Sequence, residues 1–136
     1  DYTDPNSDVA RMFSLPTPAG EDVIVHYMKR LPRAHAPGSR FNYNTGETNL
    51  AGTILARAVG KPIHLYASEA LWKPHGMEAD ALWQVDEKGQ PIAGCCISMR
   101  LRDYGRMGQL VLDGGWGLLA PEWVEGSTTV RDAFAK

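Results

Sequence analysis

The stretch Pro37-Gly38-Ser39-Arg40-Phe41-Asn42-Tyr43-Asn44-Thr45-Gly46 leads from a turn into the best-defined helix that the sequence predicts. The Pro-Gly pair favours a turn. Asn44 suits the N-cap position, because Glu47 follows three residues later, as a capping box requires. A C-terminal glycine signal at Gly60 should end the helix. Tyr43 is therefore expected just outside the helix start, close to backbone amides that have no intrahelical partner.

On both sides of this stretch the sequence predicts mostly helical segments, with one small hairpin. Helical segments are expected at 9–15, 21–31, 62–73 and from Ser98 or Arg100 to 113, with one short helical turn at Pro121 and a polar, weakly defined tail at 126–136. Two short strands are expected at 81–85 and 92–97, around a turn at 86–89. The predicted fold class is mostly α with a small β-hairpin, and residues 1–136 are expected to form a single domain.

Composition excludes several classes of function. The chain has 136 residues, of which 43% are hydrophobic and 22% charged, values typical of globular domains. Its formal net charge is -2 and its basic residues form no block, so a nucleic-acid partner is not expected. No apolar run approaches the roughly 20 residues that a membrane-spanning helix needs.

The sequence predicts neither a metal site nor a cofactor. The four histidines, His26, His35, His64 and His75, lack the spacing of metal ligands. Cys95 and Cys96 are adjacent, which is poor geometry for an ordinary structural disulfide, so they are predicted to be free and buried.

Tyr43 is the candidate catalytic residue. A phenolate at this position would be stabilised by the free amides and the positive end of the helix dipole. A nearby lysine would lower the tyrosine pKa further, which suits proton exchange with a serine hydroxyl. The alternative is a core aromatic residue packed at the helix entrance. Thr48 weakens that alternative, because a hydrophobic staple would place an apolar residue there.

A series of short motifs runs in order along the chain. They are Pro37-Gly38, Phe41, Tyr43, Leu50, Gly52, Gly60-Lys61, Leu71, Lys73-Pro74 and Gly76-Met77, then residues 93–98, Leu101-Arg102-Asp103-Tyr104, Arg106 and Gly108. This order resembles the serine β-lactamase-like family, which includes class C β-lactamases, penicillin-binding esterases and 6-aminohexanoate-dimer hydrolases. The opening residues, 1–8, resemble a loop of the nylon-oligomer-hydrolase branch.

The resemblance implies part of a serine hydrolase that cleaves an ester or linear amide through an acyl-enzyme. Tyr43 would be its general base and acid, with Thr45, Tyr2 and Trp83 contacting a small-molecule ester or amide. The family has Asn where this chain has Thr45, which argues against β-lactam hydrolysis. The implied fold is the helical subdomain of a β-lactamase-like α/β hydrolase.

The family's nucleophile motif, Ser-x-x-Lys, is absent, because no serine of the chain is followed three residues later by lysine. The late Lys-Thr-Gly or His-x-Gly motif is absent too. The chain is therefore expected to be the central piece of a larger enzyme and inactive alone. Two alternatives remain: a non-catalytic helical binding domain derived from such an enzyme, and a piece of a true β-lactamase or penicillin-binding protein. An exposed apolar surface would allow homo-oligomers, and the compartment, cytoplasm or periplasm, stays open.

Overall fold

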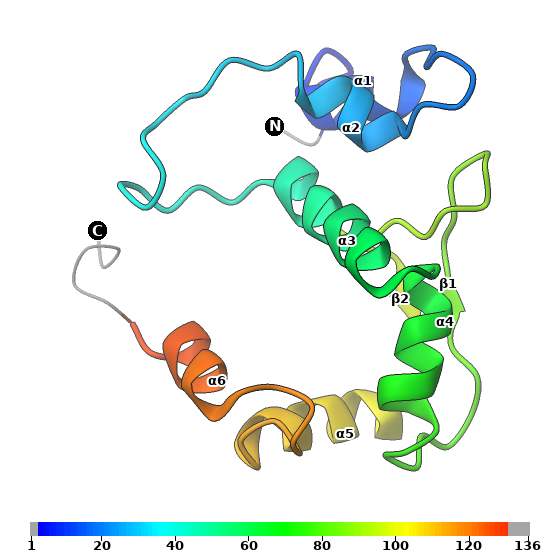
Figure 1. The fold of residues 1–136 in the computed structure, drawn as a ribbon, viewed down its shortest axis with the longest axis vertical. Helices are drawn as coiled ribbons and strands as arrows, with labels where there is room; N and C mark the ends of the chain where they lie inside the picture. The colour runs from blue at the N-terminus through cyan, green and yellow to red at the C-terminus, as the bar shows by residue number, and fades with distance from the viewer. Residues whose placement is uncertain (1–2, 131–136) are drawn as a thin grey trace.

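The computed structural model describes residues 3–130 and is mostly helical, as predicted (Figure 1). Its elements are α1 (Asp8–Ser14), α2 (Val23–Met28), α3 (Thr45–Val59), α4 (Ile63–Ala67), the π-helical turn η1 (Ser68–Trp72), β1 (Leu82–Trp83), β2 (Ile97–Ser98), α5 (Leu101–Leu112) and α6 (Pro121–Thr128). The helices follow an open arc that runs from α1 and α2 through α3 and α4 to α5 and α6. Helices α1, α2 and α3 pack against one another, and α3 also packs against α4.

Each of the first three helices begins at a side-chain cap. The carboxylate of Asp22 accepts a hydrogen bond from the Val25 amide at 2.9 Å, and the side chain of Asn44 accepts one from the Glu47 amide at 3.2 Å. Ser7 caps α1 in the same way. The predicted cap at Asn44 is thus confirmed, as is the helix end at Gly60, which adopts a left-handed conformation with φ of 68°.

Helix α2 is shorter than the predicted segment 21–31. It starts after Asp22 and ends at Met28, because the amides of Arg30 and Leu31 turn back to carbonyls only three residues earlier. Pro32 follows and disfavours helical backbone at the preceding residue. Tyr27 is buried on the face that the sequence pattern predicted.

The hairpin differs from the prediction in its second strand. β1 pairs antiparallel with β2 at Leu82–Trp83 and Ile97–Ser98, and a single further bridge joins Val85 to Pro91. Residues 92–96 do not continue the strand. The Gly94 amide donates to the Asn49 side chain on α3 at 2.8 Å, which draws this segment away from β1 into a turn. Ser98 therefore lies in β2, and Arg100 is the N-cap of α5.

The prediction that the cysteines are free and buried is wrong. Cys95 and Cys96 are joined by a disulfide between adjacent residues, and both are exposed. Cys96 has φ of 71°, a left-handed conformation that is uncommon outside glycine. The turn at 92–96 brings the two sulfur atoms together, which spacing in the sequence alone does not indicate.

Helix α3 lies close to the 92–96 turn because its facing residues are small. A Cβ atom added to Gly52 would lie 2.1 Å from the Cβ of Ala93. Asn49, only 3% exposed, completes this contact by donating to the Thr45 carbonyl at 3.0 Å and accepting from Gly94. The contact holds the first turns of α3 onto a segment 45 residues further along the chain.

Helix α5 is attached through one buried carboxylate. Asp103 is fully buried and accepts hydrogen bonds from the Glu78 amide and from the Arg106 guanidinium, both at 2.8 Å. Arg100 pairs instead with the Glu78 carboxylate at 2.9 Å. Helix α6 is longer than the predicted single turn, since it continues to Thr128 and buries Val124.

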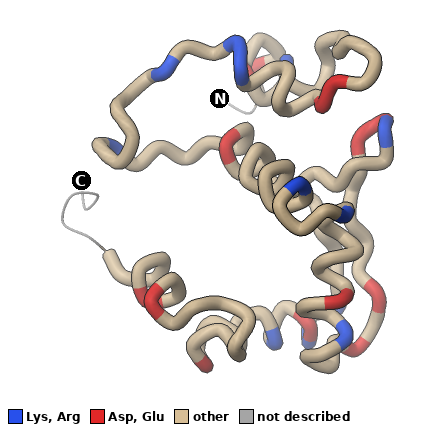
Figure 2. Tube along the Cα trace, viewed as in Figure 1, with Lys and Arg blue, Asp and Glu red and all other residues tan. Residues whose placement is uncertain are grey.

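Charges of both signs occur along the chain, although some segments carry one sign only (Figure 2). The segment between α2 and α3 carries Lys29, Arg30, Arg33 and Arg40 and no acidic residue. Within residues 3–130, none of the helices has the length and apolar character needed to cross a bilayer.

Candidate active site

The Pro37-Gly38 turn precedes the segment that leads to the start of α3. Gly38 has φ of 72°, which glycine adopts without steric cost, and the Ser39 amide donates to the Ala36 carbonyl at 3.2 Å. The following residues are extended and exposed until Asn44 caps the helix. Tyr43 therefore occupies the position just before the cap, as predicted, and its side chain is 73% exposed. Residues 3–130 therefore do not cover the Tyr43 ring, and the alternative of a core aromatic residue stays a prediction for the rest of the protein to decide.

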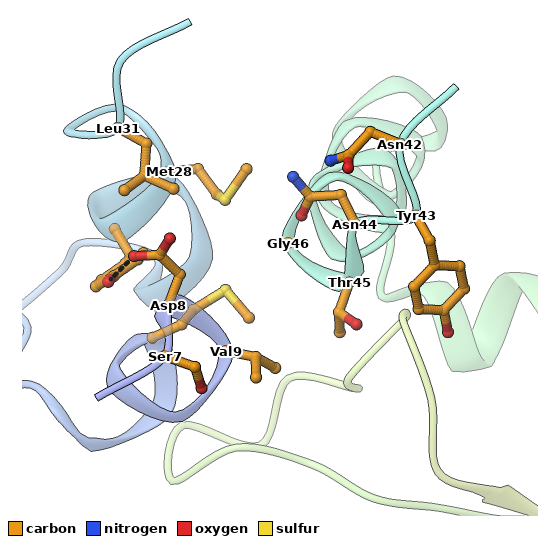
Figure 3. Close-up of a pocket in the computed structure, with 12 residues that line it drawn as sticks. Ser7, Asp8, Val9, Met28, Leu31, Asn42, Tyr43, Asn44, Thr45 and Gly46 are labelled. Atoms are coloured by element: carbon orange, nitrogen blue, oxygen red, sulfur yellow. Dashed lines mark hydrogen bonds between the residues drawn. The ribbon is translucent and has the colours of Figure 1, made fainter. Parts of the chain in front are cut away.

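Tyr43 and Thr45 line one pocket of about 220 Å³ between the start of α3 and helices α1 and α2. Figure 3 shows the ring of Tyr43 pointing away from α1 and α2, whereas the Asn44 side chain turns toward them. The opposite wall of the pocket is formed by apolar side chains, among them Met12, Met28 and Leu31. The phenol thus lies at the edge of the pocket, on the side away from α1 and α2.

A second tyrosine, Tyr27, also lines this pocket and, unlike Tyr43, is buried. Its hydroxyl donates to the Asp8 carboxylate at 2.7 Å. That hydrogen bond, assisted by burial, raises the pKa of Tyr27. A buried phenol with a raised pKa stays protonated at neutral pH and ties α2 to α1. Nothing in the sequence indicates that Tyr27 lines a pocket.

The pocket contains one serine, Ser7, and no lysine among its lining residues. The Ser7 hydroxyl is already used, because it accepts the Ala10 amide as the cap of α1. The proton-transfer candidate Tyr43 is thus at the edge of a pocket whose lining offers no serine–lysine pair.

Thr45 begins α3, and its backbone carbonyl accepts the Asn49 side chain at 3.0 Å. The two polar ends of the Asn49 side chain join the first turn of α3 to the Gly94 amide, so Asn49 holds the backbone that carries Tyr43 and Thr45. A buried Asn inside a helix could have been noticed as a polar residue in an apolar stripe, but its partner is unpredictable from spacing.

Trp83 does not line this pocket. Trp83 lies in β1, and its indole N–H donates to the Ile92 carbonyl at 2.9 Å. Tyr2 lies outside the described residues. Across residues 3–130, no three His, Cys, Asp or Glu side chains converge as a metal ion would require.

Comparison with known proteins identifies one family. The Beta-lactamase family model matches residues 2–124, which is most of the chain. The 6-aminohexanoate-dimer hydrolase of Paenarthrobacter ureafaciens is 28% identical over 133 residues, covering 92% of this chain and 34% of the hydrolase.

A solved structure agrees with this match. A Bacillus anthracis protein assigned as a 6-aminohexanoate-dimer hydrolase superposes with a TM-score of 0.71 and 29% identity. The superposition covers 80% of this chain and 29% of that protein. The chain therefore spans about a third of the length of these relatives. The fold is confirmed as part of a β-lactamase-like hydrolase.

Proposed function

Because this chain belongs to the beta-lactamase family of serine hydrolases, we propose that it supplies the proton-transfer tyrosine of an ester or linear-amide hydrolase. Tyr43 acts as general base toward a serine hydroxyl and then as general acid toward the leaving group. The serine and its lysine come from the rest of the protein. The substrate is a small ester or amide that forms an acyl-enzyme.

The position of Tyr43 is the observation that carries this proposal. Its phenol is exposed at the edge of a pocket, one residue before a capped helix start. Amides of the first turn and the helix dipole favour negative charge at this point. A lysine ammonium brought nearby would favour the phenolate further. These features support proton transfer better than a packing role.

Thr45 is proposed to contact the substrate from the first position of α3. It lines the same pocket as Tyr43, and its side chain projects from the helix start (Figure 3). Threonine presents one hydroxyl where the family presents an amide with both a donor group and an acceptor group. This difference favours esters and linear amides over β-lactams. Trp83 and Tyr2 remain proposed substrate contacts of the complete protein.

The first test uses the full-length protein that contains residues 1–136. Tyr43→Phe keeps the ring and removes only the hydroxyl, so kcat should fall by about 10² to 10⁴-fold with little change in KM. Tyr27→Phe is the matched control, because it makes the same substitution in the same pocket but removes a structural hydrogen bond. It should lower stability and leave kcat nearly unchanged. Equal kcat losses in the two variants would contradict the role of Tyr43.

A second test uses the chain by itself. It should turn over neither p-nitrophenyl esters nor nitrocefin, because its pocket holds a capping serine and no lining lysine. Turnover that a fluorophosphonate blocks would show a complete serine site within these residues. Nitrocefin hydrolysis by the full-length protein would favour a true β-lactamase instead.

The alternative, a free-standing binding domain, is less favoured by the surface of the molecule. The accessible surface is 9830 Å² for a chain of 14.9 kDa. A compact monomer of that mass exposes about 7,000 Å². Large apolar side chains stand exposed at many positions, including Leu82, Leu101 and Leu112 at 77%, 85% and 81%. A free-standing domain would cover such residues.

The exposed apolar surface also bears on self-association of the chain. In isolation, residues 1–136 should bind a hydrophobic dye and elute from size exclusion as oligomers, because exposed apolar patches promote association. If residues 1–136 instead elute as a monodisperse monomer and do not bind the dye, the alternative of a free-standing binding domain would be favoured.

A further inference from the structure

The Cys95–Cys96 disulfide lies at the surface, next to a pocket that the proposed function does not use. Both residues are exposed, so a thiol reagent in solution has access to the bond. The pocket beside it has a volume of about 560 Å³. Its walls include Phe13 and Leu15 from α1 and the loop that follows it, with Val85 and Ile92 from the hairpin.

The disulfide holds a backbone turn that is otherwise unfavourable. Cys96 has φ of 71°, a left-handed backbone conformation that is sterically unfavourable for a residue with a Cβ atom. The turn is anchored on both sides, by the Cys96 carbonyl accepting from the Gln84 amide at 3.0 Å and by the Cys95 amide donating to Ile92 at 3.3 Å. Opening the disulfide removes a covalent constraint on Cys96, so the residue becomes freer to leave the left-handed region.

The turn is connected directly to the start of α3. Gly94, which precedes Cys95, donates its amide to Asn49 at 2.8 Å, and Asn49 donates to the Thr45 carbonyl at 3.0 Å. Gly94 is also closely packed, because an added Cβ would lie 2.8 Å from the Asn49 side-chain nitrogen. A change in the turn therefore alters a hydrogen bond that holds the first turn of α3.

We propose that Cys95–Cys96 is a thiol site, opened by dithiols and then occupied by trivalent arsenicals that carry an apolar group. In the first step a dithiol thiolate attacks one cysteine sulfur, the protein S–S bond breaks, and the dithiol leaves as a cyclic disulfide. Two electrons pass to the protein, which gains two thiols. In the second step R–As=O forms two As–S bonds. The As=O oxygen leaves with both thiol protons as water, and arsenic stays trivalent.

The site matches this ligand in two respects. Two adjacent soft sulfur donors chelate one soft centre, and thiolates prefer such centres. The apolar walls at Phe13, Leu15, Val85 and Ile92 accommodate an aryl group next to the sulfurs. The inference is independent of the serine hydrolase mechanism, since it involves neither Tyr43 nor a nucleophilic serine.

Native labelling of the full-length protein that contains residues 1–136, followed by mass spectrometry of the Cys95–Cys96 peptide, tests the site. In that peptide the untreated protein should take up no iodoacetamide, whereas the protein treated with a dithiol and freed of it should take up two equivalents. Phenylarsine oxide should then add one aryl-arsenic group per reduced chain and block both alkylations. Cys95→Ser is the matched control and should form no arsenical that survives gel filtration. Alkylation without reduction, or a disulfide that native dithiol treatment leaves intact, would overturn the proposal.

Hydrogen exchange tests the connection to α3 in the wild-type chain. The Gly94 amide should exchange about fivefold faster after reduction, as expected when one hydrogen bond of about 1 kcal/mol weakens. The Gly60 amide, bonded to Arg57 at the far end of α3, serves as control and should not change. Equal Gly94 exchange in both redox states would show that the thiol site does not act on α3.

Discussion

Helices α3 and α5 are of similar length, yet they meet the rest of the molecule through opposite kinds of residue. Helix α3 buries Gly46, Asn49 and Gly52, and these small residues allow close approach to Met28 and to the 92–96 turn. Helix α5 buries Asp103 and Leu110 but leaves most of its predicted apolar face exposed, with Leu101 at 85% and Tyr104 at 47%.

The two helices are therefore held in different ways. Small side chains and matched hydrogen bonds hold the first turns of α3 against Met28 and the 92–96 turn, whereas Ile54 and Leu55 on the same helix stay exposed at 60% and 39%. The apolar face of α5 has no matching surface among residues 3–130. A strongly amphipathic helix of this kind normally packs on a core. The partial coverage of the relatives, about a third of their length, is consistent with a core that lies elsewhere in the protein.

The largest effect is expected for Asp103→Ala, which tests how α5 is held. This substitution removes the buried acceptor of the Glu78 amide and the Arg106 guanidinium and leaves both unpaired. The urea midpoint of residues 1–136 should fall further for Asp103→Ala than for Gly52→Ala or Glu21→Gln. Glu78→Gln is the control, because it removes only the exposed pair with Arg100. Similar midpoints for the two variants would mean that Asp103 does not anchor α5.

Asp103 also predicts a pH dependence. The Glu78 amide is the chief cause of its lowered pKa, with the Ala79 amide and Arg106 adding to the effect against desolvation. A carboxylate whose folded pKa is lowered stabilises the fold above its unfolded pKa, and this contribution is lost as pH falls toward the lowered value. Stability measured against pH should therefore decline less steeply in acid for Asp103→Asn than for the wild type.

The next largest effect is expected for two glycine substitutions, one in α3 and one in α5, which should change the free energy of unfolding in opposite directions. Gly52→Ala should destabilise the chain by about 1–3 kcal/mol, because the new Cβ overlaps Ala93. Gly105→Ala in α5 meets nothing within 4 Å, so the higher helix propensity of alanine should stabilise by about 0.5–1 kcal/mol. Urea unfolding measures both. Adding Ala93→Gly to Gly52→Ala should restore stability, and a failure to do so would place the clash elsewhere.

The smallest effect is expected for Glu21→Gln, beside the cap of α2. Hydrogen bonds from Lys29 and then His26 lower the Glu21 pKa from 4.5 to about 2. Its stabilising contribution is complete above pH 4.5 and is lost as pH falls toward 2. The wild type should lose more stability than Glu21→Gln across that interval. Added salt should reduce the difference, because the pair is partly exposed. A salt-independent difference would indicate a buried interaction instead.

Much of the candidate site was predictable from local sequence. The Pro-Gly turn, the cap at Asn44 and the position of Tyr43 depend on neighbouring residues only, and capping chemistry identifies them. The disulfide and the role of Asn49 were not predictable. Both depend on the 92–96 turn, where the Gly94 amide donates a hydrogen bond to the side chain of Asn49, 45 residues earlier in the chain. Spacing and periodicity carry no information about such a contact.

The sequence alone determined the helix boundaries set by caps and glycines, the placement of Tyr43 before α3, and the absence of a Ser-x-x-Lys motif. Only the tertiary structure decided which predicted apolar faces are covered, which strand is interrupted, and that Cys95 and Cys96 are bonded. The physical reason is the distance along the chain over which each kind of interaction acts. Caps and turns use interactions within about four residues, whereas burial and pairing depend on which distant segments meet.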